Sequence, residues 1–104
     1  FWLEQEKLIE EIYRTAQRLG KEDENILKII LFGSLAAKRG IPGSDADILI
    51  ILKKDDNPFM KRIAEWSKKF SVNFPVEIFP YAEKEFNNPI IREALKKGIT
   101  LFER

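Results

Sequence analysis

The stretch Ser44–Leu52, with the sequence Ser-Asp-Ala-Asp-Ile-Leu-Ile-Ile-Leu, places two acidic residues at the start of an otherwise apolar run. Such a run is typical of a central strand that is covered on both faces. Side chains two positions apart on a strand share a face, so Asp45 and Asp47 are predicted to point the same way, with Cα atoms roughly 6 to 7 Å apart. Their carboxylates could then converge on one or two cations.

This acidic pair favours a metal site of a particular kind. Two ionised carboxylates on one face repel each other, and a poorly solvated carboxylate is costly unless it is paired or bound to metal. The chain has no histidine and no cysteine. Oxygen ligands must therefore hold any metal, which favours Mg²⁺ or Mn²⁺ over zinc. The alternative is that Asp45 is a turn residue and that Asp47 is exposed or salt-bridged.

A second apolar strand is predicted upstream, over Ile26–Phe32, and it ends at Gly33. Glycine lets a backbone approach a phosphate, and a helix N-terminus after it offers free N–H groups to an anion. We expect a short helix over Ser34–Arg39, capped by Ser34, as a crossover to the strand over 46–52. By itself, a Gly-Ser pair after a strand is more often only a turn and a cap. Next to the acids, it predicts a phosphate cradle.

Apolar periodicity predicts the other elements. They are a helix over Trp2–Leu19 with Gly20 as its stop, a helix over Phe59–Phe70 with Trp66 and Phe70 in the core, a strand over Val76–Phe79 between Pro75 and Pro80, a helix over Pro89–Lys97 that ends at Gly98, and an edge strand or packed tail over Ile99–Phe102.

Glu77 is a single acid between Val76 and Ile78, in a strand that should lie beside the strand over 46–52. Such a residue is more often a solvent-facing carboxylate on an edge strand. In company with Asp45 and Asp47 it can complete a three-carboxylate cluster.

Length and composition limit the other possibilities. The 104 residues fit one domain, with an N-terminal helix over 1–20 and a core over 26–104. Lys and Arg number 18 against 17 Asp and Glu, so no nucleic-acid partner is expected by default. The longest apolar run, Ile48–Leu52, is far below the ~20 residues that span a bilayer. We therefore expect a cytoplasmic protein without a membrane partner. Apolar residues of the first helix could serve a homo-oligomer interface as readily as the core.

The segment Gly33-Ser34, nine intervening residues and Ser44-Asp45-Ala46-Asp47-Ile48 together resemble the signature of the DNA polymerase beta-type nucleotidyltransferase superfamily. The small size resembles its minimal nucleotidyltransferase (MNT) branch. The resemblance covers roughly 26–104, because segments 74–81, 91–95 and 98–104 also look like these domains. It implies an α/β (α+β) fold, in which a small mixed sheet is flanked by helices.

The resemblance also implies roles for single residues. Asp45 and Asp47 would bind the Mg²⁺ or Mn²⁺ that holds the triphosphate of ATP or another nucleoside triphosphate. Glu77 would bind a second metal and help to activate the attacking hydroxyl. Ser34, beside Gly33, and Ser44 would contact phosphate oxygens. This arrangement suits in-line transfer of a nucleotidyl group.

The sequence departs from the family pattern in two places. Relatives commonly carry a basic residue three positions after the serine, often followed by glycine, where this chain has Ala37 and Lys38. The usual clamp on the triphosphate is therefore displaced or missing, and Lys38 or Arg39 is the candidate replacement. Glu77 stands where aspartate is more frequent, and its longer stem could shift the second metal.

These observations leave three functions open. The first is transfer of AMP, or another nucleotide, to a hydroxyl; the MNT resemblance suggests an antitoxin that modifies a tyrosine of a partner HEPN toxin. The second is an interaction module that neutralises a partner by binding alone, which Ala37 favours and the three acids oppose. The third is a transferase acting on a small molecule or RNA. The absence of a second domain and the neutral charge oppose this third function.

Overall fold

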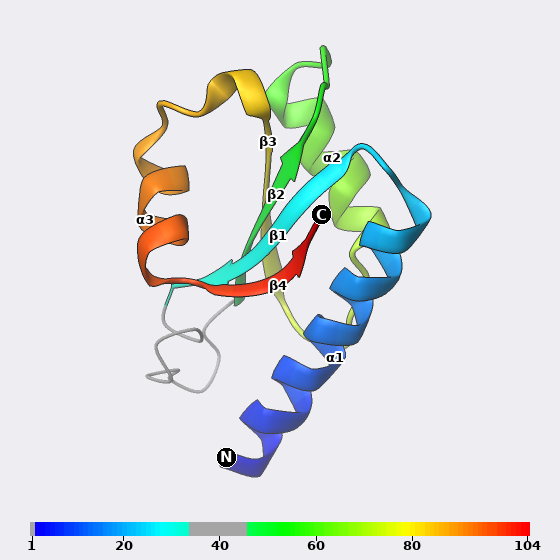
Figure 1. The fold of residues 1–104 in the computed structure, drawn as a ribbon. Coiled ribbons are helices and arrows are strands. Elements are labelled where there is room, and N and C mark those ends of the chain that lie inside the picture. Colours follow the sequence, from blue (N-terminus) through cyan, green and yellow to red (C-terminus); the bar gives the residue numbers. More distant parts are fainter. Residues whose placement is uncertain (1, 34–45) are drawn as a thin grey trace.

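The computed structural model describes residues 2–33 and 46–104, which form a four-stranded mixed sheet with helices on both faces (Figure 1). The strands are β1 (Ile26–Phe32), β2 (Ala46–Leu52), β3 (Val76–Ala82) and β4 (Ile99–Glu103). Their order across the sheet is β3-β2-β1-β4. β1 pairs antiparallel with β2 and β4, whereas β2 and β3 pair in parallel. The expected mixed sheet flanked by helices is therefore confirmed.

The helices cover the sheet unequally. α1 (Trp2–Glu22) and α2 (Phe59–Lys69) pack on one face, and α3 (Pro89–Lys97) packs on the other (Figure 1). A short 3-10 helix, η1 (Glu83–Glu85), leads from β3 toward α3. None of the helices in the two described ranges is long and apolar enough to cross a membrane.

Two apolar clusters hold these layers together. Residues of β2 alternate between them, with Ile48 and Ile50 facing α1 and α2 and with Leu49 and Ile51 facing α3. β2 is thus covered on both faces, as its apolar run predicts. Trp66 of α2 is also in the core, as expected. The core on the α1 side includes Leu8, Ile12, Ala16, Leu19, Ile29, Phe70 and Leu101. Apolar residues of the first helix thus serve the chain's own core.

The predicted helical crossover between the first two strands needs a correction. β1 and β2 are neighbours in the sheet and pair antiparallel from Ile26 opposite Leu52 to Phe32 opposite Asp47. Antiparallel neighbours do not need the crossover that joins parallel strands. The connecting residues 34–45, and with them the helix predicted over 34–39, lie outside the described residues.

Gly20 does not end the first helix, which continues to Glu22. A Cβ built on Gly20 would lie 2.5 Å from ring atoms of Phe102 in β4. The glycine therefore lets the helix approach the sheet closely.

Pro80 does not end the third strand, which continues to Ala82. β3 is an edge strand, where a missing backbone N–H does not break the ladder on the paired side. The Pro80 carbonyl accepts a hydrogen bond from Arg62 Nη1 at 3.0 Å.

Candidate active site

Asp47 lies near the start of β2, on the face of the sheet that α3 covers. Its side chain is half-buried, and it follows the same alternation as Leu49 and Ile51 on that face. Its Cα partner on β1 is Phe32, which belongs to the same cluster. Asp47 is thus held at the edge of an apolar layer.

Glu77 is the in-register partner of Asp47 on the neighbouring parallel strand. Paired residues of adjacent strands lie about 4.8 Å apart and point to the same face of the sheet. Glu77 is exposed because β3 is an edge strand. The sheet therefore brings the two carboxylates together, one half-buried and one open to solvent.

Gly33 directly follows β1 at the end of the sheet where Asp47 and Glu77 lie. It follows Phe32 with φ at +81°, a backbone conformation that favours glycine. A Cβ built on Gly33 would overlap Oδ2 of Asp47. Only glycine leaves room for the Asp47 carboxylate where it lies.

Aromatic side chains line the same face behind the acids. Phe79 lies two residues after Glu77 on β3, and its ring centroid is 5.5 Å from that of Phe32. Charges above such an apolar floor interact more strongly than charges in bulk water. Asp47, which is half-buried beside this layer, can therefore hold a hard cation more firmly than a fully solvated carboxylate would.

The other predicted site residues lie outside the described residues. These are Ser34, Lys38, Ser44 and Asp45. Within 2–33 and 46–104, no three acidic side chains gather closely enough to form a metal site. The third predicted carboxylate, that of Asp45, therefore stays a prediction.

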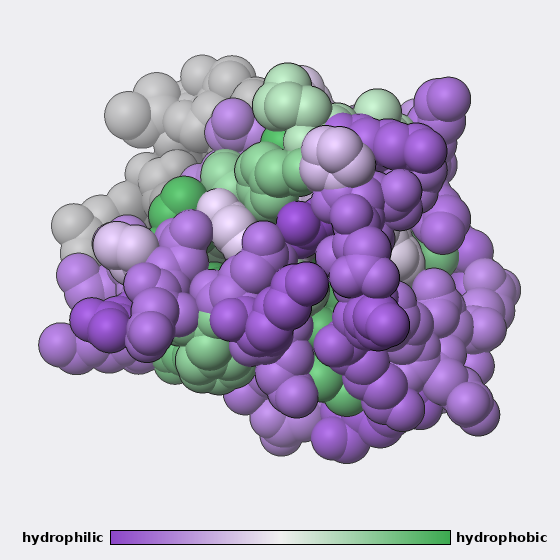
Figure 2. Space-filling model, turned by 90° about the horizontal axis from the view of Figure 1, so that it is seen from above, coloured by the Kyte–Doolittle hydropathy of each residue, from purple (hydrophilic) through white to green (hydrophobic). Residues whose placement is uncertain are grey.

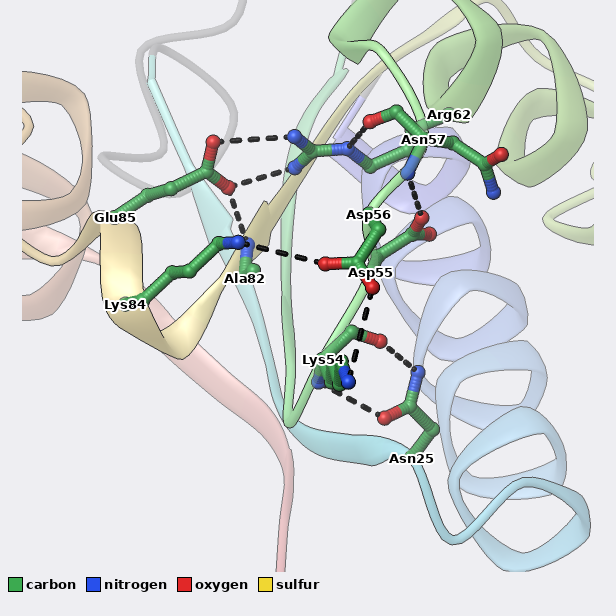
Figure 3. A network of polar contacts seen from close by, with 9 residues as sticks. All are labelled: Asn25, Lys54, Asp55, Asp56, Asn57, Arg62, Ala82, Lys84 and Glu85. Carbon is green, nitrogen blue, oxygen red and sulfur yellow. Dashed lines mark hydrogen bonds and ion pairs between the residues drawn. The ribbon is translucent and has the colours of Figure 1, made fainter.

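A partly buried ion pair that the sequence did not predict lies at the opposite end of β3 (Figure 3). Arg62 Nη1 and Nη2 donate to the two carboxylate oxygens of Glu85 at 2.7 and 3.1 Å, and Nε donates to the Asn57 carbonyl at 2.9 Å. The hydrogen bond from Arg62 lowers the pKa of Glu85, and the same bond raises the pKa of Arg62. Arg62 follows Phe59 and precedes Trp66 at helical spacing, which was the available signal that it faces the sheet.

This ion pair ties α2 to β3 and η1. Glu85 also accepts a hydrogen bond from the backbone N–H of Ala82 at 2.7 Å. Nearby, Asn25 and Lys54 exchange hydrogen bonds, and Lys84 and Lys54 pair with Asp56. Figure 2 shows this end of the molecule as mainly hydrophilic. The charged side chains of this network pair with one another, so we interpret the network as structural.

Comparison with known proteins connects this geometry to a family. The family described as polymerase beta nucleotidyltransferase matches residues 7–104. This chain belongs to that family. The match includes Gly33, Asp47 and Glu77, and it extends the resemblance upstream into α1. The chain is accordingly a nucleotidyltransferase domain with the polymerase beta-type fold.

Solved structures agree with this fold. A candidate nucleotidyltransferase from Sulfolobus solfataricus is 21% identical, with a TM-score of 0.72 over 96% of this chain and 84% of the other. A toxin-antitoxin structure with AMP-PNP is 14% identical, with a TM-score of 0.60 over 88% of this chain and 73% of the other. The sequence of this chain matches no curated protein.

Proposed function

We propose that the domain transfers AMP, or another nucleoside monophosphate, from a nucleoside triphosphate to a hydroxyl of a partner protein. The observation that carries the proposal is the in-register pair of Asp47 and Glu77 beside the positive-φ turn at Gly33. Family membership supports a transferase, and the acidic pair supports the proposal of a metal-bound triphosphate at this end of the sheet.

Asp45, Asp47 and Glu77 are the proposed ligands of Mg²⁺ or Mn²⁺. Two observations support the fit. Carboxylate oxygens are the ligands that these hard cations prefer, and Gly33, which has no Cβ, leaves room for the Asp47 carboxylate at this end of the sheet. When bound, the cation neutralises charge on the phosphates and stabilises the attacking and leaving oxygens.

The reaction forms a bond from the acceptor oxygen to the α-phosphorus and breaks the bond from that phosphorus to the oxygen that bridges to the β-phosphate. Pyrophosphate leaves with the electrons of the broken bond. Glu77 lies on an edge strand and is exposed, so an acceptor hydroxyl from a partner can approach it and pass its proton to solvent or to the carboxylate. We assign Ser34, Ser44 and Lys38 to the phosphate oxygens on the basis of the family pattern.

For the acceptor, we propose a tyrosine of a HEPN-type toxin, which this domain inactivates as its antitoxin. The similarity to a toxin-antitoxin structure with AMP-PNP supports a protein partner and a nucleoside triphosphate. The near-equal numbers of basic and acidic residues give little attraction to nucleic acid. ATP is the proposed donor.

A second candidate function is neutralisation of the partner by binding alone. Ala37 favours it, since the family's usual basic residue on the triphosphate is absent at that position. On this proposal the acidic pair is a remnant, and inhibition of the partner does not depend on ATP.

Labelled ATP separates the two functions. The protein encoded beside this chain is mixed with the domain, Mg²⁺ and ATP labelled at the α-phosphate. We expect label on the partner, no label when the γ-phosphate carries it, and no label with Asp45→Asn plus Asp47→Asn. Glu103→Gln is the matched control, because Glu103 is an exposed glutamate on the other edge strand. Inhibition of the partner that is equally strong without ATP would contradict the transfer reaction.

A further inference from the structure

We propose that Lys97, in the last turn of α3, is the cationic clamp on the β- and γ-phosphates of the nucleotide. The inference rests on the proposed function and adds a residue from outside the Gly33-Ser34 segment to the site. It adds a positive charge to that of Lys38, because Ala37 stands where the family commonly has a basic residue.

The end of α3 is fixed at the same end of the sheet as the acidic pair. Gly98 follows Lys97, and its N–H donates to the Ala94 carbonyl at 2.8 Å. A Cβ built on Gly98 would lie 2.9 Å from the Leu31 carbonyl oxygen, so the helix ends directly against β1. Leu31 precedes Phe32, whose Cα partner is Asp47. One step along β1 and one step across the sheet therefore separate the end of α3 from Asp47, and Glu77 lies one strand further.

α3 also packs on the face of the sheet that carries the acids. Ile91 and Ala94 are fully buried there, and Ile90 packs against the same cluster. Lys97 lies seven residues, or about two turns, after Ile90 and thus shares its side of the helix. Lys96 is turned about 100° from Lys97 and lies opposite Ile91 and Ala94. Lys97 is thus at the margin of the packed face, whereas Lys96 points to solvent.

The charge of Lys97 is available for a ligand. The side chain is exposed, and it forms no ion pair with any residue in the described part of the chain. A triphosphate brings more negative charge than one divalent cation offsets, and the acids add to it, so a further positive charge near the phosphates strengthens binding.

Basic residues at the end of α2 are placed less well for this role. Lys68 and Lys69 lie in its last turn, and α2 packs on the opposite face of the sheet. The ammonium of Lys69 lies 4.4 Å from the ring centroid of Trp66 and is already engaged there.

A lysine in the last turn of a helix is also favoured by the helix dipole. That effect applies to Lys96 and Lys97 alike. Lys96 is therefore the matched control, because it shares the helix turn and the exposure of Lys97 but points away from the sheet.

The test is calorimetric titration of the full chain with ATP and with AMP in the presence of Mg²⁺. We expect Lys97→Gln to weaken ATP binding about tenfold or more, as loss of a charge-assisted phosphate contact does. Binding of AMP, which lacks the β- and γ-phosphates, should change by less than about twofold. Lys97→Arg should retain most of the affinity, and Lys96→Gln should leave both affinities unchanged.

Two results overturn the inference in distinguishable ways. If the wild-type chain binds ATP but Lys97→Gln and Lys96→Gln behave alike, the clamp is wrong and the proposed function stands. If the wild-type chain shows no Mg²⁺-dependent ATP binding, the proposed function fails and the clamp fails with it.

Discussion

Asp47 and Glu77 are register partners with different surroundings, and this difference suggests different roles. Asp47 is half-buried against Gly33, whereas Glu77 stands exposed on an edge strand. A carboxylate with little freedom suits a permanent metal ligand. An exposed carboxylate can meet both a cation and an incoming acceptor. The difference arises from the positions of their strands in the sheet, because β2 is central and β3 is at the edge.

Gly33→Ala tests how closely the turn must approach Asp47. The new Cβ would overlap the Asp47 carboxylate, and alanine would be strained at φ +81°. We expect a loss of about 1 to 2 kcal/mol in the free energy of unfolding and a large loss of Mg²⁺-dependent ATP binding. Urea denaturation and calorimetry measure the two effects separately. Unchanged ATP affinity would show that the position of the Asp47 carboxylate beside the turn is unimportant.

Glu85→Gln tests the partly buried ion pair of Arg62 and Glu85 through its pH dependence. The hydrogen bond from Arg62 holds the pKa of Glu85 below its ordinary value of 4.5 in the folded state. A lowered folded pKa contributes stability above pH 4.5 that is lost as the pH falls through that lowered value. The stability gap between wild type and Glu85→Gln should therefore be widest near neutral pH and should close in acid. A gap that stays constant from about pH 7 to about pH 3 would contradict this account. The raised pKa of Arg62 contributes stability that is constant across this window, because that contribution is lost only in strongly alkaline solution.

At the scale of elements, the helices and strands with regular apolar spacing were predicted well. Phe59–Lys69 and Pro89–Lys97 match their predicted bounds to within one residue, because burial on one side of a helix imposes that spacing. Gly20 and Pro80 were misinterpreted as stops. Local rules treat glycine and proline as breaks. Here α1 continues past Gly20, which packs against Phe102, and β3 continues past Pro80 because β3 is an edge strand.

Gly20→Ala tests the packing of Gly20 against Phe102 through the sign of the change in the free energy of unfolding. In an exposed helix the change would stabilise by about 1 kcal/mol. Here the new Cβ would lie 2.5 Å from the ring of Phe102, so we expect the free energy of unfolding to fall. The loss should shrink or reverse in a Phe102→Leu background, which a double-mutant cycle by urea denaturation measures. Stabilisation in the wild-type background would show that α1 does not need this close approach.

The direction of strand pairing and the ion pair of Arg62 could not be predicted from local pattern. β1 and β2 are joined by a segment long enough for either a crossover or an antiparallel return, and the sequence does not choose between them. Arg62 lies among apolar positions of α2, where a long side chain commonly extends to solvent. Its partner Glu85 is 23 residues away, beyond the reach of any spacing rule.

For the whole molecule, the two ends of the sheet differ: one carries a network of ion pairs, and the other carries the candidate active site. Charged side chains around Arg62, Asp56 and Glu85 are paired with one another at one end (Figure 3). At the other end, Asp47 and Glu77 lie beside Gly33, and the C-terminus of α3 comes close to them. α1 packs against β1 and β4 in the same cluster as α2, which supports the proposal of one domain. The proximity of Asp47 and Glu77 was predicted from sequence because both begin apolar strands. The remaining ligand, Asp45, stays a prediction.

Paramagnetic relaxation by Mn²⁺ tests the central claim most directly, because it locates the cation in the folded chain. Substoichiometric Mn²⁺ is added with ATP to the isotopically labelled protein, and the broadening of each backbone amide signal is recorded. We predict that Gly33, Asp47 and Glu77 broaden first and that Glu77→Gln weakens the effect, whereas Glu103→Gln does not. Selective broadening around Asp55, Asp56 and Glu85 instead, at the opposite end of the sheet, would contradict a metal-triphosphate site at the Asp47–Glu77 pair.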